Sequence, residues 1–253
     1  HEAIRYYLVS SIIYFDRQLE RKHTTMMVHG DRKVDVHRID AEIVKNYLFV
    51  LENLLEDDVE NGDLTNSTNL FKSIYDEVFN TKIDQIRFDE LIKRIHSIIK
   101  GKKIKIEVVN ADRQRGNSRI PEINWDDSNL WIVIGGTGLS RGYVVSGLIT
   151  SWMPREALKF TADTLEQMGR FFGYHTGYKD LIRIFLKRAS IEAFKAYHIF
   201  EKSVWNALEP CINDGTRIFD AVLELEFPEE LDYPTSSTKM KRLDNKNKFL
   251  WAS

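Results

Sequence analysis

The sequence has few of the features that mark secreted, disulfide-rich or membrane proteins. Its 253 residues include a single cysteine, Cys211, which excludes an internal disulfide and a zinc cluster built on several thiolates. It contains no run of about eighteen apolar residues and no positively charged leader before a short apolar stretch, so neither a membrane span nor a signal peptide is indicated. We therefore expect a cytoplasmic protein with no membrane partner.

An excess of charge of either sign is also absent. Lys and Arg total 36 while Asp and Glu total 38, which gives a formal net charge of −2. The net charge of the chain therefore gives no sign of nucleic-acid binding, although loop amides and a few local cations can still bind a nucleic-acid backbone. Hydrophobic residues at 43% and charged residues at 29% are typical of a globular protein with a real core. Because the chain begins at His1 inside a helix-like pattern, we expect it to be a piece of a longer protein.

Strand and helix patterns alternate through most of the chain. Short apolar runs rich in β-formers predict buried strands, and apolar residues spaced three and four apart predict helices. The predicted strands are 24–29, 104–109, 130–134, 147–153 and 181–186. This alternation favours an α/β domain with a mainly parallel sheet flanked by helices.

The first half of the chain also carries signals for packing and capping. The long helix after residue 31 has one clear apolar stripe, formed by Ile39, Ile43, Tyr47, Val50 and Leu54. We expect this stripe to face the core, and Asp31 or Asp35 to cap the helix. The acidic, polar segment 56–69 predicts a solvent-exposed connection, and two helices are expected after it, with Asp84 capping the second.

The last two predicted helices have start and stop signals of their own. In the helix predicted over 161–170, Asp163 and Glu166 are spaced as a capping pair. Ser190 is expected to cap the final helix and Pro210 to stop it, because proline cannot supply the backbone N–H that a helix interior needs.

A glycine-rich loop directly follows the apolar run that ends at Ile134. Four glycines lie among residues 135–142, together with Thr137, Ser140 and Arg141. In open α/β sheets ligands bind at the carboxyl ends of strands, where glycine lets the backbone approach a phosphate. A tight structural turn is the alternative, but the polar neighbours favour a phosphate-facing loop. No Lys-Ser or Lys-Thr pair follows, so the chain has no nucleotide-binding P-loop of its own.

When the residues of the predicted helix 161–170 are placed at about 100° per residue, they separate into two faces. One face is apolar and belongs to the core: Leu165, Met168 and Phe172. The opposite face carries Gln167, Arg170 and Tyr174. A guanidinium beside an amide suits the charge on a transferring phosphoryl group, whereas the alternative is that Arg170 only pairs with a surface carboxylate.

Three segments, taken in order, resemble the second RecA-like domain of superfamily-two helicases and translocases. The strand Thr25–His29 is similar to motif IV, GGTGLSRG to motif V and QMGRFFGY to motif VI. More closely, MMVHGDRKVDV, the GGTGLSRG loop and LEQMGRFFGYHTGYKDL resemble the Z-one domain family, often labelled as endonucleases and found in bacterial restriction and defence systems. The resemblance extends from the first helix to about Leu208.

This resemblance implies a site shared with another domain. Arg170, supported by Gln167, would be the arginine finger that reaches ATP and Mg²⁺ held mainly by an absent N-terminal RecA-like domain. The loop residues implied on the nucleotide side are Gly136, Gly138, Arg141 and Gly142. The residues implied in nucleic-acid contact are His29, Gly30, Thr137 and Ser140. Gly173 departs from the usual second arginine of motif VI, although a single arginine finger can contribute about 10³ to 10⁵ in rate.

The chain is therefore expected to be the second RecA-like half of an ATP-dependent, DNA-acting helicase or translocase of a restriction or defence system. Its domain would cover residues 1–210 with a helical insertion at about 56–100, followed by a C-terminal extension over 211–253. Its partners would be DNA, the ATP-binding domain, and nuclease or methyltransferase components.

Two alternatives stay open at the level of sequence. Gly173 favours a degenerate RecA-like module that binds DNA or a partner protein without ATPase activity. The family label suggests an endonuclease, but a metal-dependent nuclease needs clustered carboxylates, and Glu56 to Glu60 fall in a polar segment typical of solvated surface. Because His23, His29 and His37 are scattered, we expect no metal site on this chain.

Overall fold

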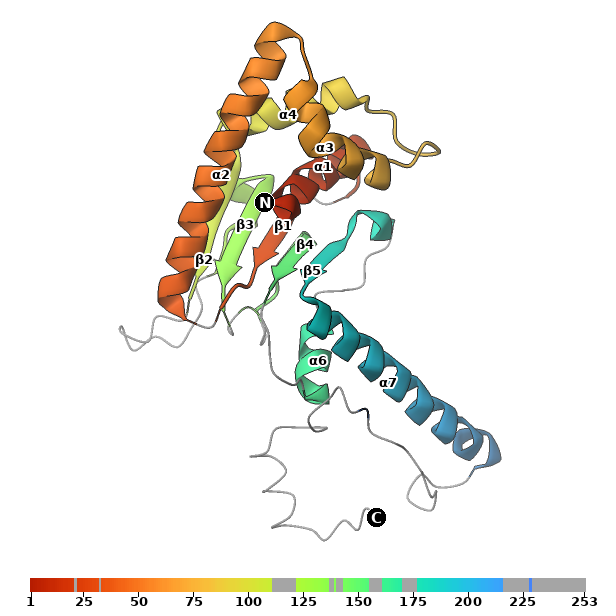
Figure 1. The fold of residues 1–253 in the computed structure, drawn as a ribbon. Helices are drawn as coiled ribbons and strands as arrows, with labels where there is room; N and C mark the ends of the chain where they lie inside the picture. The colour runs from red at the N-terminus through yellow and green to blue at the C-terminus, as the bar shows by residue number, and fades with distance from the viewer. Residues whose placement is uncertain are drawn as a thin grey trace. The chain divides into compact units, whose positions relative to one another are not determined.

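The computed structural model describes residues 1–20, 22–31, 33–110, 122–136, 139, 143–154, 161–169, 177–215 and 228. The chain divides into two compact units, His1–Arg155 with Phe171–Phe185, and Glu156–Arg170 with Leu186–Ser253. The predicted α/β class is confirmed, because the fold is built on a five-stranded parallel sheet with the order β2-β3-β1-β4-β5 (Figure 1). The strands are β1 (Thr24–Val28), β2 (Ile104–Val109), β3 (Leu130–Gly135), β4 (Leu148–Met153) and β5 (Arg183–Leu186).

β1 is the central strand and explains why its sequence is an unbroken apolar run. All five of its residues are buried, as expected for a parallel strand that is covered on both faces. The register places Val28 opposite Ile134 of β3 and opposite Trp152 of β4. By contrast, β2 lies at the edge of the sheet, and its half-buried and exposed residues alternate with the period of two that a strand imposes.

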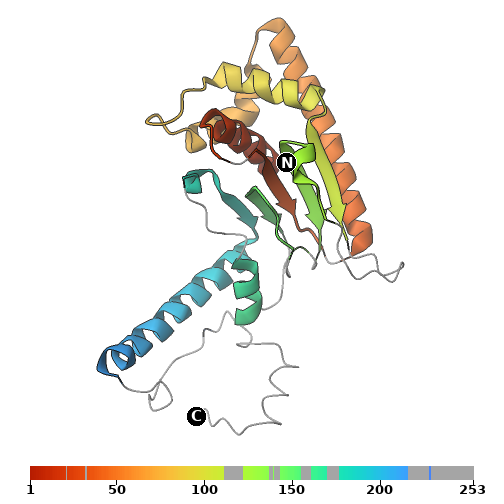
Figure 2. The ribbon, with the colours of Figure 1, turned by 180° about the vertical axis from the view of Figure 1, so that it is seen from behind.

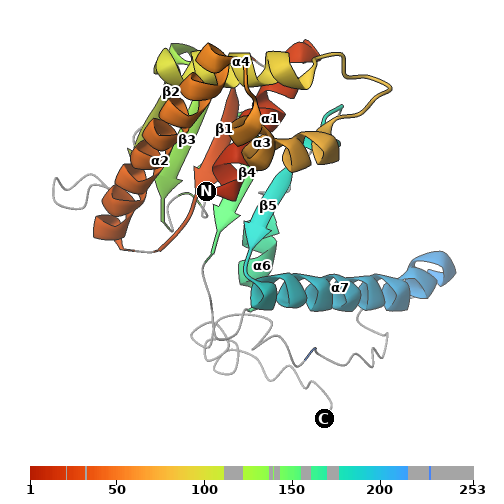
Figure 3. The ribbon, with the colours of Figure 1, turned by 45° about the horizontal axis from the view of Figure 1, so that its top comes forward.

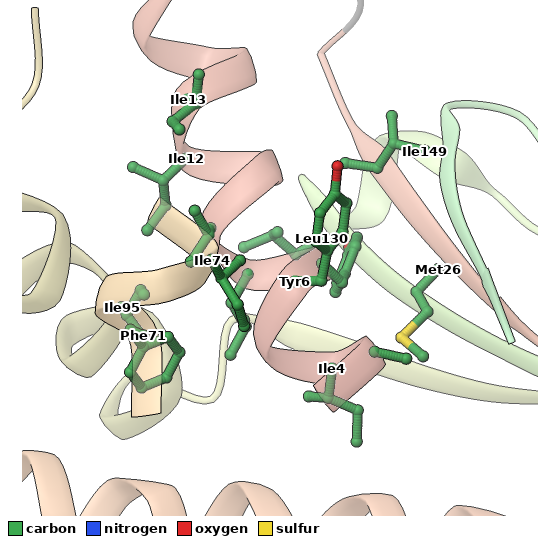
Figure 4. Close-up of a cluster of buried hydrophobic side chains, with 14 of the residues drawn as sticks. Ile4, Tyr6, Ile12, Ile13, Met26, Phe71, Ile74, Ile95, Leu130 and Ile149 are labelled. Atoms are coloured by element: carbon green, nitrogen blue, oxygen red, sulfur yellow. The ribbon is translucent and has the colours of Figure 1, made fainter. Parts of the chain in front are cut away.

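Four helices of the first unit cover one face of this sheet. They are α1 (Glu2–Asp16), α2 (Val34–Asn61), α3 (Thr65–Val78) and α4 (Phe88–Lys100). α1 contacts β1 and β4, whereas α2 contacts β2 and β3 and lies beside them in both Figure 1 and Figure 2. α3 and α4 pack against α1 and α2 (Figure 3). Alternate strand residues such as Met26 and Leu130 join the same buried cluster as Tyr6 and Phe71 (Figure 4), which makes one continuous core.

α2 buries a different face from the one that we predicted. Ile39, Ile43 and Val50 are 58%, 50% and 49% exposed. The buried face instead consists of His37, Ala41, Val44, Leu48, Leu51, Leu55 and Asp58. The helix therefore carries two apolar stripes, and periodicity alone does not decide which of them meets the sheet. The predicted caps are also wrong: the N-cap is Lys33, and Asp31 Oδ1 accepts a hydrogen bond from the Lys33 amide at 3.1 Å.

The acidic segment 56–69 is mostly exposed, as predicted, but it is mostly helical and contains two buried polar residues, Asp58 and Ser67. α2 continues to Asn61, Gly62 caps it with a φ of 67°, and α3 begins at Thr65. Asp58 is only 3% exposed, and its Oδ2 accepts hydrogen bonds of 2.5 Å from both the amide and the hydroxyl of Ser67. The carboxylate therefore holds the end of α2 against the first turn of α3, where helix amides lack partners of their own.

Asp84, the predicted cap of α4, belongs to an ion-pair network instead. The N-cap of α4 is Arg87, while Asp84 Oδ1 lies 2.6 Å from Arg17 Nε. Arg17 also pairs with Asp180 at 2.7 Å, so one guanidinium joins three distant segments of the first unit. Burial alone would lower the pKa of Arg17, but its hydrogen bonds to Asp84 and Asp180 outweigh burial and raise it.

The second unit contains the helices α6 (Ala162–Gly169) and α7 (Arg188–Asp214). Leu165 is buried against Ala193 with Met168 packed beside it, as predicted for the apolar face of α6, while Phe172, the third residue of that face, lies outside the described residues. Glu166 does not close a capping pair with Asp163: its Oε1 accepts a hydrogen bond of 2.5 Å from the Tyr197 hydroxyl and so joins α6 to α7.

α7 is longer at both ends than the sequence predicted. Its N-cap is Lys187, so Ser190 lies in the first turn, and the helix runs past Pro210 until Gly215 ends it with a φ of 69°. Proline removes one backbone donor but need not end a helix, whereas a left-handed glycine does. The predicted division at residue 210 therefore falls within α7. Two 3₁₀ turns complete the described elements, Trp125–Asp127 and Lys179–Leu181, and the second replaces the start of the strand predicted over 181–186.

Candidate functional site at the carboxyl edge of the sheet

The carboxyl ends of β1, β2 and β3 meet at one edge of the sheet. The register pairs Val28 with Ile134 and Val109 with Gly135. The residues that follow these positions, His29, Asn110 and Gly136, therefore leave the sheet side by side. Ligands of open parallel α/β sheets bind at this edge, so it is the candidate site of the first unit.

The segment after β1 combines an interior histidine with a closely packed glycine. The His29 amide donates to the Trp152 carbonyl at 2.8 Å, which extends the pairing with β4, and the residue is 2% exposed. Its ring is therefore part of the interior. Gly30 follows directly, and a Cβ at this position would lie 2.5 Å from Asp40 Oδ2. The Asp40 carboxyl group thus approaches the Gly30 backbone closely, and a side chain at this position would force Asp40 to move.

The segment after β3 begins with two glycines for the same kind of reason. A Cβ on Gly135 would lie 2.5 Å from the Val109 carbonyl oxygen, and one on Gly136 would lie 2.9 Å from His37 Cε1. The Leu139 amide donates to the Gly136 carbonyl at 3.0 Å, and Leu139 is buried. The first residues of the loop, Gly135 and Gly136, are therefore closely packed.

His37, in the first turn of α2, links the starts of these segments. Its Nδ1 lies 2.6 Å from Asn110 Oδ1 and its Nε2 lies 2.9 Å from the Asp31 carbonyl oxygen, while the residue is 1% exposed. A carbonyl oxygen only accepts, so Nε2 is the donor to Asp31. The sequence offers one signal for this link: a histidine in the first turn of the helix predicted to follow the loop after β1.

Asp40 adds a half-buried carboxyl group one helical turn later. Its Oδ2 atom is buried and has no hydrogen-bond partner among the described residues. Burial raises the pKa of Asp40, the charge of Asp31 raises it further, and His37 opposes both. The described part of the edge is thus rich in carboxyl and imidazole groups.

Most of the predicted site residues lie outside the described residues. They are Thr137, Gly138, Ser140, Arg141, Gly142 and Arg170. They include Arg141 and Arg170, the two cations expected to meet phosphate. Gln167 lies in α6 of the second unit and is half-buried. Of the predicted residues, Gly30 and Gly136 are therefore the ones that the structure places together at the edge, with His29 beneath them.

In the described part of the chain, no group of three or more His, Cys, Asp and Glu side chains is arranged to hold a metal ion. Likewise, none of the described helices combines the length and the apolar character needed to cross a membrane.

A pocket of about 490 Å³ lies at the opposite edge, by the amino ends of β2 and β3. Its apolar lining includes Phe15 and Ile98, and its cations are Lys102, Lys103 and Lys105. α1 and α4 both end beside it, and the carboxyl ends of helices carry partial negative charge. The lysines complement these helix ends, so the pocket has a structural explanation and the carboxyl edge stays the candidate site.

Comparison with known proteins gives one kind of match. A family model described as "Z1 domain" matches residues 1–229. Neither the curated proteins nor the solved structures contain a significant match to this chain.

Proposed function

The chain belongs to the Z1 domain family, and from this premise we propose that it is the second RecA-like half of an ATP-dependent, DNA-acting helicase or translocase-like protein. In this proposal the chain works with an ATP-binding RecA-like domain and with nuclease or methyltransferase components of a cytoplasmic defence system. The family and the parallel α/β fold are compatible with this role; the role itself is our inference.

One relationship carries the proposal. The segments that resemble motifs IV and V leave the sheet at the ends of adjacent parallel strands, where Gly30 and Gly136 pack closely. In such sheets this edge is where loop amides meet a ligand, and amides contact phosphates without reading base sequence. Gly30, Thr137 and Ser140 would therefore contact the DNA backbone, with His29 supporting them from the interior.

The ATP-linked role falls to other residues of the same motifs. Gly136, Gly138, Arg141 and Gly142 would connect the DNA-facing loop to the nucleotide side of the interface. Arg170, with Gln167 beside it on α6, would place a guanidinium near the transferring phosphoryl group. ATP with Mg²⁺, held mainly by the other domain, would supply the free energy for movement.

DNA-stimulated ATP turnover by the longer protein, one that includes a Walker-type lysine, tests this role. Arg170→Ala is expected to lower the turnover number by about 10³ to 10⁵. Arg87→Ala is the matched control, because its side chain is 79% exposed and, among the described residues, its ion pair is with Asp89 at 3.0 Å. Turnover that Arg170→Ala leaves unchanged would contradict the arginine-finger assignment.

Gly173 supports a second candidate, a RecA-like module that binds DNA or a partner protein without ATP turnover. Tight DNA binding by a longer protein that shows no DNA-stimulated ATP turnover would favour this candidate. The third candidate is an endonuclease; Mg²⁺-dependent cleavage of plasmid DNA by the isolated chain would establish it, and we expect intact plasmid.

A further inference from the structure

We propose that His37 is a positioning residue that fixes the starting points of three loops at the carboxyl edge and thereby prepares the loop after β3 for a phosphodiester backbone. The inference rests on the proposed function for its DNA readout. It extends that function to a residue on α2 that lies outside all three helicase-like motifs.

The first support is the set of segments that one side chain holds. The His37 ring bonds to the Asp31 carbonyl after β1, six residues away, and to the Asn110 side chain after β2, 73 residues away. The segment after β3 contacts the same ring, since a Cβ on Gly136 would be 2.9 Å from Cε1. Few interior side chains join the ends of three neighbouring strands, and the carboxyl edge is where these ends lie.

The second support is that both ring nitrogens are used. Nε2 donates to the Asp31 carbonyl. Asn110 Oδ1 accepts from Nδ1 when both ring nitrogens carry a proton, and a turned Asn110 amide would present its NH₂ group to Nδ1 when only Nε2 does. Asp40 interacts electrostatically with both His37 and Asp31. Both nitrogens of the ring are therefore committed to partners on two different segments.

The third support is the packing of the ring itself. His37 is 1% exposed, and Gly136 lacks the Cβ that would push the loop away from it. Removing the imidazole deletes its hydrogen bonds to Asp31 and Asn110 and leaves empty space beside Gly136. Segments that lose these contacts must be ordered when they bind, and the entropy cost of ordering is subtracted from the affinity.

The test uses the full 253-residue chain and a fluorescein-labelled 20-base-pair DNA duplex, with affinity measured by fluorescence anisotropy over a range of salt. His37→Ala is expected to weaken binding about tenfold and to reduce the slope of log K against log salt by about one phosphate contact. His37→Gln, which keeps one donor and one acceptor, should recover part of the affinity. Asn110→Ala combined with His37→Ala should weaken binding no more than His37→Ala alone, because both changes break the same link.

The matched control is His96→Ala, which removes another buried histidine, 9% exposed, from α4. It should lower the thermal unfolding midpoint without changing the DNA affinity or the salt slope. Equal loss of affinity in the His37 and His96 variants would show a general effect of destabilisation and overturn the proposal.

A second measurement does not depend on DNA. Hydrogen–deuterium exchange of the free chain should be faster in His37→Ala and His37→Gln, in peptides that contain Asp31, Asn110 or Gly136, and unchanged there in His96→Ala. Unchanged exchange in the His37 variants would overturn the positioning role. A wild-type chain that binds no DNA, yet shows these exchange differences, would overturn the proposed function and leave the structural link established.

Discussion

Asp40 packs its carboxyl group against the backbone of Gly30, so closely that a Cβ on Gly30 would lie 2.5 Å from Asp40 Oδ2. Gly30 lies two residues after the end of β1, and Asp40 lies in the second turn of α2. Their contact therefore packs α2 against the segment that connects it to β1. This contact, with the links made by His37, means that the candidate site is shaped by α2 as much as by the strand ends.

Asp40→Asn is expected to stabilise the protein at pH 7. The pKa of Asp40 is raised mainly by burial, so the native state holds the proton more tightly than the unfolded state does, and stability falls as pH rises through this pKa. Removing a buried carboxylate oxygen without a partner should raise the free energy of unfolding by about 1 kcal/mol. Urea unfolding at pH 7 and at pH 4 checks this. The difference in the free energy of unfolding between the variant and the wild type should be smaller at pH 4 than at pH 7. A less stable variant at pH 7 would contradict it.

Asp58→Asn should have the opposite effect. Burial raises the pKa of Asp58, but hydrogen bonds from Ser67 and Asn66 outweigh burial and lower it. The ionised carboxylate therefore stabilises the fold above the ordinary pKa of an aspartate, and this stability is lost as pH falls through the lowered value. We expect a loss of about 2 kcal/mol at pH 7, measured by urea unfolding, and a much smaller loss near pH 2. An equal loss of unfolding free energy at pH 7 and near pH 2 would show that the charge of the Asp58 carboxylate does not contribute to stability.

Gly136→Ala tests the close approach of the loop to His37. The new Cβ would meet His37 Cε1 at 2.9 Å, and the buried ring is held by two hydrogen bonds. Forced rearrangement of a packed site should lower the free energy of unfolding by about 1 to 3 kcal/mol. Gly169→Ala is the control, because nothing lies within 4 Å of its Cβ position in a helix, where alanine is favoured. If both variants are equally stable, the packing against His37 is looser than described.

Arg17→Met should be among the most destabilising single changes in the first unit. It leaves the buried carboxylate of Asp84 without its guanidinium, and breaking such a pair costs about 3 to 5 kcal/mol. The comparison variant is Arg87→Met, which breaks an exposed pair with Asp89 and should cost about 1 kcal/mol or less. Thermal and urea unfolding of both variants check the ranking, and a similar cost for the two would refute a special role of Arg17.

Much of the fold was predictable because its signals are local. The apolar runs Thr24–Val28 and Leu130–Gly135 predicted buried strands, and the structure has strands there. The second of the two helices expected after residue 69 is α4. The family was likewise recognised from three short segments, and the match over residues 1–229 confirms it. The RecA-like assignment, the arginine finger and the DNA contacts stay predictions.

The sequence also located part of the candidate site. Gly30 and Gly136 were expected at the edge because each follows a predicted buried strand. His37, Asp40 and Asn110 were not recognised, because they come from a helix face and an edge strand that carry no motif. Their roles follow from contacts between distant segments, such as His37 with Asn110, 73 residues away, and His37 with Gly136, 99 residues away.

The sequence by itself therefore determined the α/β class, the strands and the family, since each depends on neighbouring residues in the chain. Only the tertiary structure decided which of the two apolar stripes of α2 is buried, why Asp58 and Asp84 are interior, and how His37 joins three loops. Local sequence allows either apolar face of a helix to be buried, and it allows a carboxylate to pair with any of several donors. Packing against distant segments decides both, because a buried polar group is stable only where it has a hydrogen-bond partner.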